Sequence, residues 1–373
     1  MSEYQFVHFL ALDRPLDEEQ LEFMQRQSSR AEITRWEFTN EYHYGDFHGN
    51  ACEMLRRGYD VHLHYANFGT RRLMIRLPAG LPCDRQTFVA FRIEYGLEWD
   101  ADKKGPGGIL EIEPTTDGDS YEEVMYDASS LLPELAPVRD LLIAGDLRPL
   151  YLAWLACSGD DESQEPPVPA GLNQLTPPLA ALANLYEVDE DLIAAAAERS
   201  PPLPKATDAG ETLNRWIAQQ SKDDLRELLR RLLSQDTGAT RAETLARVRD
   251  ESAALPWPLA EPTRTLAQLR ESAGRRRNQR LRQEERKRDA ARRKRLAAVA
   301  ADPQKTIAAA EKLVKLRSAA NYEKAAAELA DLREALGGEL GTARARAVAE
   351  KLRRDNPRVH GLTAALRKQG LLD

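Results

Sequence analysis

A run of basic residues from Thr263 to Ala300 constrains the fold of this chain more than any other feature. Between Arg275 and Arg295 it holds twelve Lys and Arg residues against three Asp and Glu, and no Pro or Gly follows Gly274 within the run. Arg, Lys, Glu, Gln, Ala and Leu all favour helix, so the run predicts one long helix. Leu281 is the only sizeable apolar residue between Gly274 and Arg295, too little for a core-facing stripe. We therefore expect an exposed basic helix over residues 263–300.

Three interpretations of this helix are open on the sequence alone. It is a solvated strut or connector, a phosphate-binding element, or a segment that docks onto an acidic protein surface, for which the chain's own N-terminal half is one candidate. Phosphate binding would release condensed counterions and would therefore depend on salt. The candidate nucleic-acid-binding residues are Arg275, Arg276, Arg277, Arg280, Arg282, Arg286, Lys287, Arg288, Arg292, Arg293, Lys294 and Arg295.

The composition limits the class of protein. The formal charge of −7 conceals a basic run inside an otherwise acidic chain, so the whole-chain charge is a poor guide to partners. Cys52, Cys83 and Cys157 are widely spaced and predict neither a disulfide framework nor a zinc site. The N-terminal segment lacks the features of a signal peptide, and no apolar run reaches the length of a membrane span. We expect a cytoplasmic protein without a membrane partner.

The first part of the chain predicts an α+β domain over residues 1–158. Strands are expected over Tyr4–Leu12, Ile33–Thr39, Tyr59–Ala66, Arg71–Leu77, Thr87–Tyr95 and Ile109–Ile112, because apolar and polar residues alternate or β-branched and aromatic residues cluster there. Helices are expected after Asp17 and over His48–Arg57. This order of elements favours a ferredoxin-like α+β sandwich.

The remainder of the chain is expected to be mostly helical. Its predicted divisions are an acidic, Pro-rich linker at 159–171, a helical domain at 172–262, the long basic helix at 263–300, and a C-terminal interaction module of short helices at 301–373. Within the helical domain, one stripe of leucines at helical spacing predicts a buried helix face: Leu225, Leu228, Leu229, Leu232 and Leu233.

Period-two alternation places several charged residues on one face of the predicted sheet. Four arginines on that face are candidate ligand-binding residues, namely Arg35, Arg72, Arg76 and Arg92. An open sheet can bind RNA or a phosphorylated ligand, but this face has few aromatic residues and no RNP1 pattern. The alternative is an ordinary charged, solvent-facing sheet surface.

A group of histidines and carboxylates supplies the candidate catalytic residues, which are His43, Asp46, His48, His62 and His64. Imidazole and carboxylate groups bind metals or transfer protons. No spacing fixes these side chains around one point, and the chain has no nucleophile elbow, P-loop or Gly-x-Gly-x-x-Gly motif. The sequence therefore assigns no metal ligand and no cofactor, and most of these residues are better explained as surface polar groups.

Several segments resemble a known group of proteins. They are Asn184–Ala197, the Arg/Glu-rich run, Asn321–Arg333 and Leu366–Leu371, with fainter similarity in Glu41–Phe47 and Asn67–Arg71. Together they resemble uncharacterised bacterial proteins associated with SWIM-type zinc-finger proteins. The SWIM motif itself, Cys-x-Cys followed by Cys-x-His, is absent, so the resemblance implies no direct zinc binding. It implies a setting close to nucleic acid and transfers no catalytic residue.

The combined expectation is a non-enzymatic intracellular adaptor or scaffold. Its basic helix would contact DNA, RNA or an acidic protein, and its C-terminal module would dock a protein partner. The alternative is a metal- or His-dependent enzyme that acts on nucleic acid through the N-terminal domain. The sequence does not choose between DNA and RNA, and it does not give the oligomeric state.

Overall fold

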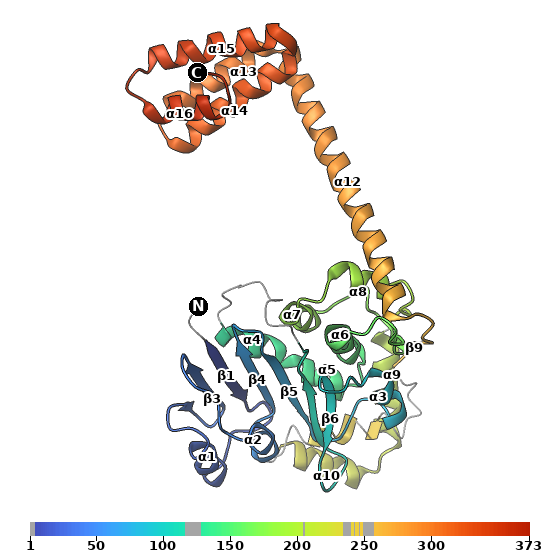
Figure 1. The fold of residues 1–373 in the computed structure, drawn as a ribbon. Helices are drawn as coiled ribbons and strands as arrows, with labels where there is room; N and C mark the ends of the chain where they lie inside the picture. Colours follow the sequence, from blue (N-terminus) through green and yellow to red (C-terminus); the bar gives the residue numbers. More distant parts are fainter. Residues whose placement is uncertain are drawn as a thin grey trace. The chain divides into compact units, whose positions relative to one another are not determined.

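The computed structural model describes residues 4–115, 128–203, 206–233, 240–241, 243–245, 247–248 and 257–373. It divides into two compact units, Met1–Arg277 and Asn278–Asp373, and the elements of each are labelled in Figure 1. The first unit contains an antiparallel sheet with helices, and the second is helical. The predicted α+β class with a mostly helical C-terminal half is confirmed. Within the described residues, no helix combines the length and the apolar character that crossing a membrane requires.

The sheet of the first unit has seven strands in the order β2-β3-β1-β4-β5-β7-β6, and every neighbouring pair is antiparallel. The strands are β1 (Gln5–Leu10), β2 (Glu32–Ile33), β3 (Glu37–Tyr42), β4 (Val61–Ala66), β5 (Arg71–Leu77), β6 (Leu97–Ala101) and β7 (Gly108–Ile112). In the centre of the sheet, Phe9 lies opposite His62, and His62 lies opposite Met74.

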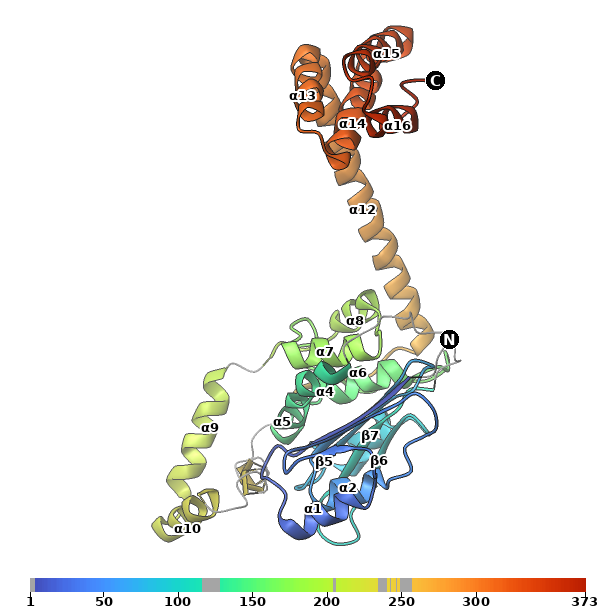
Figure 2. The same ribbon diagram turned by 90° about the vertical axis from the view of Figure 1, so that its left-hand side faces the viewer.

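Both faces of this sheet carry a hydrophobic core. One face presents residues such as Leu63 and Ile75 to the larger core, which is shared with the helices that lie between Ala128 and Ala197. The other face presents Val7, Phe9 and Met74 to a smaller core beneath α1 (Glu18–Gln25) and α2 (Ala51–Arg57). Figure 2 shows these two helix layers on opposite sides of the strands. The second face is therefore only partly open to solvent.

The helices of the first unit follow capping and packing signals. A capping box between Asp17 and Gln20 starts α1, and the Asn50 side chain caps α2. Further helices of this unit are α3 (Arg85–Phe91), α4 (Ala128–Leu135), α5 (Pro137–Ile143), α6 (Arg148–Cys157), α7 (Pro177–Leu185), α8 (Glu190–Ala197), α9 (Ala206–Gln219) and α10 (Lys222–Leu232).

Two predicted strands differ from the structure. The strand predicted over Thr87–Tyr95 is wrong, because Asp84 caps a helix there by accepting from the Thr87 amide at 2.8 Å, and the following residues form α3. The strand predicted over Ile33–Thr39 is interrupted. The Thr34 hydroxyl accepts from the amides of Trp36 and Glu37 and turns the chain between β2 and β3.

Residues 159–171, expected as a solvated linker, lie within the fold of the first unit. Val168–Pro169 form β8, which pairs with β9 (Leu259–Ala260), and Val168 is fully buried in the larger core. Glu165 is also buried, and both of its carboxylate oxygens accept from Arg264 at 2.6 and 2.8 Å. This ion pair fixes the segment to the chain just before the long helix α12 (Leu266–Ala301).

The second unit packs four helices and the end of α12 around one apolar core. They are α13 (Pro303–Lys315), α14 (Ala319–Leu336), α15 (Gly338–Asp355) and α16 (His360–Lys368). Asp302 caps α13 with Pro303 as its first residue, and Gly337 ends α14 with φ of 65°. Leu329, Leu332 and Leu362 are completely buried in this core, and Val299 of α12 joins them.

Candidate nucleic-acid interface

The predicted long basic helix is present as α12, and its two ends are held by different units. Leu266, Leu269 and Ala273 lie in the core of the first unit. In the same unit, Arg276 pairs with Glu198 at 2.5 Å, and Arg277 pairs with Asp189. In the second unit, Arg292 pairs with Glu334 and Arg295 with Asp331, both at 2.8 Å. These arginines therefore already have acidic partners.

The other basic residues of α12 divide into two groups. Arg275 pairs with Glu271 and Arg280 with Glu284 along the helix. Six exposed cations form no ion pair or hydrogen bond with any residue that the structure describes: Arg282, Arg286, Lys287, Arg288, Arg293 and Lys294. These six are the members of the predicted set that remain available to an external anion.

Five of these six cations share one side of the helix. At about 100° per residue, Arg282, Arg286, Lys287, Arg293 and Lys294 fall within a sector of about 140°. Glu284, Glu285 and Asp289, the only acidic residues between Arg275 and Arg295, all fall outside this sector. We call this sector the acid-free face. Arg292, Arg295 and Val299, which pack α12 onto the second unit, lie on the opposite side.

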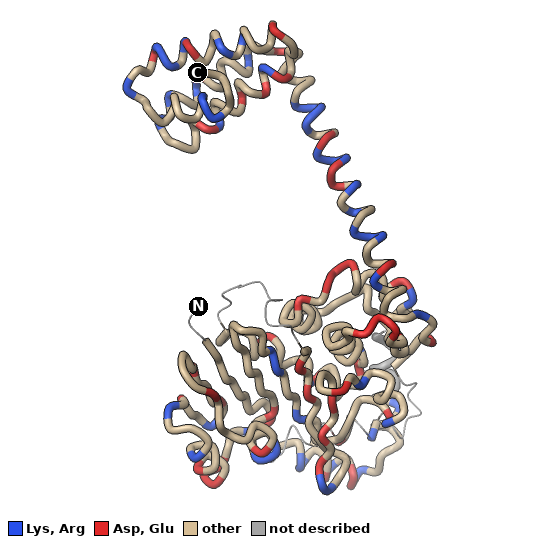
Figure 3. Tube along the Cα trace, viewed as in Figure 1, with Lys and Arg blue, Asp and Glu red and all other residues tan. Residues whose placement is uncertain are grey.

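The second unit as a whole is basic. It contains 23 Lys and Arg residues and 13 Asp and Glu residues, which gives a formal charge of +10. Because the whole chain carries −7, the first unit carries −17. Lys and Arg residues recur along most of α12 in Figure 3. The acid-free face is thus part of a unit whose overall field attracts anions.

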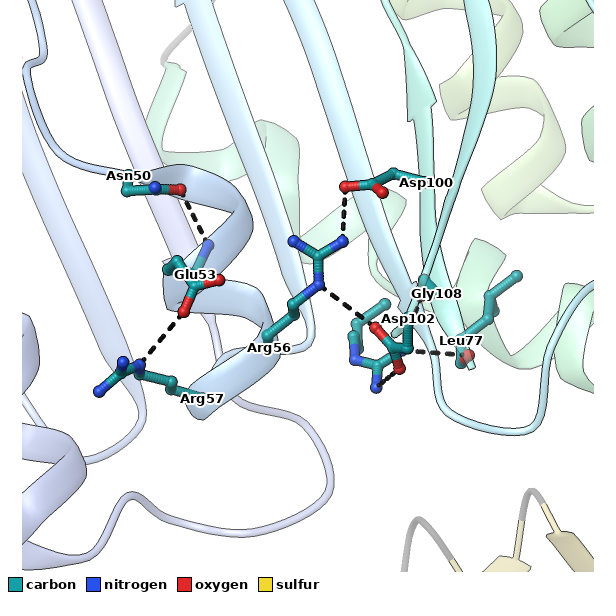
Figure 4. A network of polar contacts seen from close by, with 9 residues as sticks. Asn50, Glu53, Arg56, Arg57, Leu77, Asp100, Asp102 and Gly108 are labelled. Atoms are coloured by element: carbon teal, nitrogen blue, oxygen red, sulfur yellow. Dashed lines mark hydrogen bonds and ion pairs between the residues drawn. The ribbon is translucent and has the colours of Figure 1, made fainter. Parts of the chain in front are cut away.

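The predicted sheet-face arginines do not form a comparable site. Arg72 pairs with Glu111 of the neighbouring strand β7 at 2.5 Å, and Arg76 pairs with Asp102, just after β6, at 2.5 Å, so both arginines already have acidic partners. Figure 4 shows the contacts around Asp102, to which Arg56 of α2 also donates. Arg35 and Arg92 lie outside the strands, in the turn before β3 and at the end of α3. Their placement on one sheet face was therefore wrong.

A cavity of about 130 Å³ next to this network is lined by five arginines. The most buried of them, Arg139, makes a two-pronged ion pair with Asp13 and contacts Asp60 at 3.0 Å. It also donates to the Arg76 carbonyl at 2.8 Å. These contacts use the donors of Arg139 to join α5 to β5 and to the loops that contain Asp13 and Asp60, so Arg139 is not available to an external anion.

The predicted histidine group is divided between the core and the surface. His62 is 1% exposed and stacks on Phe9, with ring centroids 3.9 Å apart. His64 bonds Gln5 at 2.8 Å, and Gln5 in turn donates to Asp46 at 2.8 Å. His43 and His48 are exposed in the loop after β3. Within the described residues, no three His, Cys, Asp or Glu side chains are arranged to hold a metal ion.

Burial sets the charge of the core histidines. It lowers the pKa of His62 well below its ordinary value, and burial followed by the nearby Arg72 lowers the pKa of His64. His8, which the sequence did not single out, is also buried, and burial lowers its pKa although Glu37 lies 2.7 Å away. Neutral imidazoles are therefore part of the folded sheet.

These shifts predict a loss of stability in mild acid. The unfolded chain takes up protons below about pH 6.5, while folded His62 does not. As the pH is lowered below that point, the free energy of unfolding should therefore decrease, by up to about 1.4 kcal/mol per pH unit for each such histidine. In urea titrations at pH 7.5, 6.5 and 5.5, the free energy of unfolding of His62→Gln should decrease less from the highest to the lowest pH than that of the wild type. His48→Gln, at an exposed position, should keep the wild-type slope; equal slopes in all three proteins would contradict the assignment.

Comparison with known proteins places the chain in no family. No family model matches it, no curated protein matches it, and no solved structure matches it. The resemblance to SWIM-associated proteins stays a prediction.

Sequence reasoning identified the basic helix but treated its twelve cations as equivalent. The partners that separate them, such as Glu198 and Glu334, lie far away in the sequence, 78 and 42 residues from the arginines they bind. The acid-free face itself could have been found by placing the sequence on a helical wheel, because it depends only on residue spacing.

Proposed function

We propose that this protein is a non-enzymatic adaptor or scaffold that holds nucleic acid on the acid-free face of α12. The observation that carries the proposal is the set of five exposed cations on one helix face, without acidic partners in the described chain, in a unit with a formal charge of +10. Each of these side chains can neutralise one phosphate and release its condensed counterions.

The test removes the charges of that face in the full-length chain. At physiological salt, electrostatic binding of this kind has a dissociation constant of about 10⁻⁴ to 10⁻⁶ M, and it becomes tighter at 50 mM salt. A variant in which Arg282, Arg286, Lys287, Arg293 and Lys294 are all replaced by Gln should show no saturable binding to duplex DNA or RNA in fluorescence anisotropy at 50 mM salt. All five sites are exposed, so the fold should be retained.

A charge-matched variant separates this site from the general charge of the unit. It replaces five exposed basic residues elsewhere in the second unit by Gln: Lys305, Lys312, Lys315, Lys324 and Arg344. This control should bind within about threefold of the wild type, because it leaves the acid-free face intact. Equal losses in both variants would refute a dedicated site. Absence of nucleic-acid binding in the wild type would favour an acidic protein as the partner of α12.

A further inference from the structure

Between the cations of the acid-free face lies a strip without charge. The five cations form two rows, one of Arg282, Arg286 and Arg293 and the other of Lys287 and Lys294, about 100° apart around the helix. Gln279, Gln283 and Ala290 fall between the rows, and all three are exposed. The face is therefore two basic ridges that flank a narrow strip of amide and methyl groups.

This arrangement matches the major groove of B-form DNA. That groove is about 12 Å wide and admits one α-helix, with the phosphates of the two strands on either side. Along α12, the span from Arg282 to Lys294 is about 18 Å. A helix in the groove would direct its two basic rows to the two strands and its uncharged strip to the base edges. Gln can bind adenine there, and the Ala methyl group can contact the methyl group of thymine.

The opposite side of α12 is compatible with this orientation. The contacts that hold the helix to the second unit come from Arg292, Arg295 and Val299, which lie about 140° to 200° from the uncharged strip. Because those contacts are on the far side, the strip and both basic rows are left exposed along this part of the helix.

Other nucleic acids fit the same face less well. A-form RNA duplexes have a deep, narrow major groove that a helix cannot enter. Single strands are held by aromatic stacking platforms, and α12 contains no aromatic residue. We propose that α12 binds duplex DNA by lying in its major groove, with Gln279, Gln283 and Ala290 facing the bases. This inference rests on the proposed function and names its ligand.

The inference is tested with duplexes whose major grooves differ in accessibility. The full-length protein is titrated with a DNA duplex, with the same duplex carrying glucosylated 5-hydroxymethylcytosine, which fills the major groove, and with an RNA duplex of the same sequence. Binding should be at least about tenfold weaker to the glucosylated and RNA duplexes than to the plain DNA duplex. Equal affinity for all three, abolished by the five Gln substitutions, would overturn major-groove binding and leave the proposed function intact. No salt-dependent binding to any of them would overturn both.

Two neighbouring substitutions provide a matched pair within the protein. Ala290 lies on the uncharged strip, and Ala291 lies one residue further around the helix, outside the two rows; both are exposed. Ala290→Glu places a carboxylate against the bases and should weaken DNA binding at least about tenfold. Ala291→Glu makes the same change of charge and should weaken it by about threefold or less. Equal losses of DNA affinity in the two variants would show that the added negative charge alone weakens binding, and would contradict the proposed orientation of α12 in the major groove.

Discussion

Replacing Glu165 by Ala should lower the free energy of unfolding of the first unit by about 3–5 kcal/mol, the usual cost of removing one partner from a buried ion pair. The Glu165 side chain is completely inaccessible to solvent, and Arg264 is nearly so. Both carboxylate oxygens accept from Arg264, and the Tyr151 hydroxyl donates to the same carboxylate at 2.5 Å. Without Glu165, the guanidinium would stay buried, and among the described residues its remaining hydrogen-bond partner would be the Ala195 carbonyl, 3.0 Å from Nη1.

Chemical unfolding followed by tryptophan fluorescence would measure this loss. Glu162→Ala, at an exposed position in the same segment, should change stability by no more than about 0.5 kcal/mol. The double variant Glu165→Ala with Arg264→Met should recover part of the loss, because it removes the uncompensated charge. A loss below about 1 kcal/mol for Glu165→Ala would show that the segment contributes little to the fold.

The segment around Glu165 is an example of a structure that could not be predicted from the local sequence. Three prolines and a cluster of acidic residues at 159–171 are typical of a solvated linker. The partner that draws Glu165 into the core is 99 residues away, and no local pattern contains that information. Composition indicates whether a segment would be solvated in isolation. An ion pair with a residue distant in the sequence can bury the same segment.

The strands that were correctly predicted have strong local signals. β4 and β5 alternate or cluster apolar and β-branched residues, and a tight connection joins them. The error at Thr87–Tyr95 arose because aromatic and β-branched residues favour strands, although Asp84 just before them is a helix-capping residue. Phe88 and Phe91 are three residues apart and both buried, which is a helical spacing.

The leucine stripe of α10 is a third case. Its spacing predicted a helix, which is confirmed, and a buried face, which was wrong: none of its residues is buried by the part of the chain that the structure describes. Leu229 is 56% exposed. Most of the chain between residues 234 and 256, which follows this helix, lies outside the described residues. Amphipathic spacing thus predicts the helix more securely than it predicts what covers the apolar side.

The candidate nucleic-acid interface on α12 was also only partly predictable from the sequence. The basic run guaranteed a charged helix, because its residues favour helix and offer almost nothing to bury. Which cations remain available depended on acidic residues brought close by the fold, such as Asp189 and Asp331. The sheet-face arginines failed as candidates for the same reason, because Glu111 and Asp102 lie beside them.

The largest effect that this account predicts is the salt dependence of DNA binding. Five phosphate contacts in duplex DNA correspond to a slope of about −4.5 in the logarithm of the binding constant against the logarithm of salt concentration. Raising the salt from 50 to 200 mM should then weaken binding by about 500-fold. Replacing a single member of the acid-free face, such as Arg286 by Gln, should reduce the magnitude of that slope by about one.

The most direct measurement is therefore a salt titration of the full-length protein with duplex DNA, repeated for Arg286→Gln and for Arg344→Gln as a surface control. We expect a slope near −4.5 for the wild type and the control, and near −3.6 for Arg286→Gln. A wild-type slope near zero, or the same slope in all three proteins, would contradict the claim that the acid-free face of α12 holds nucleic acid.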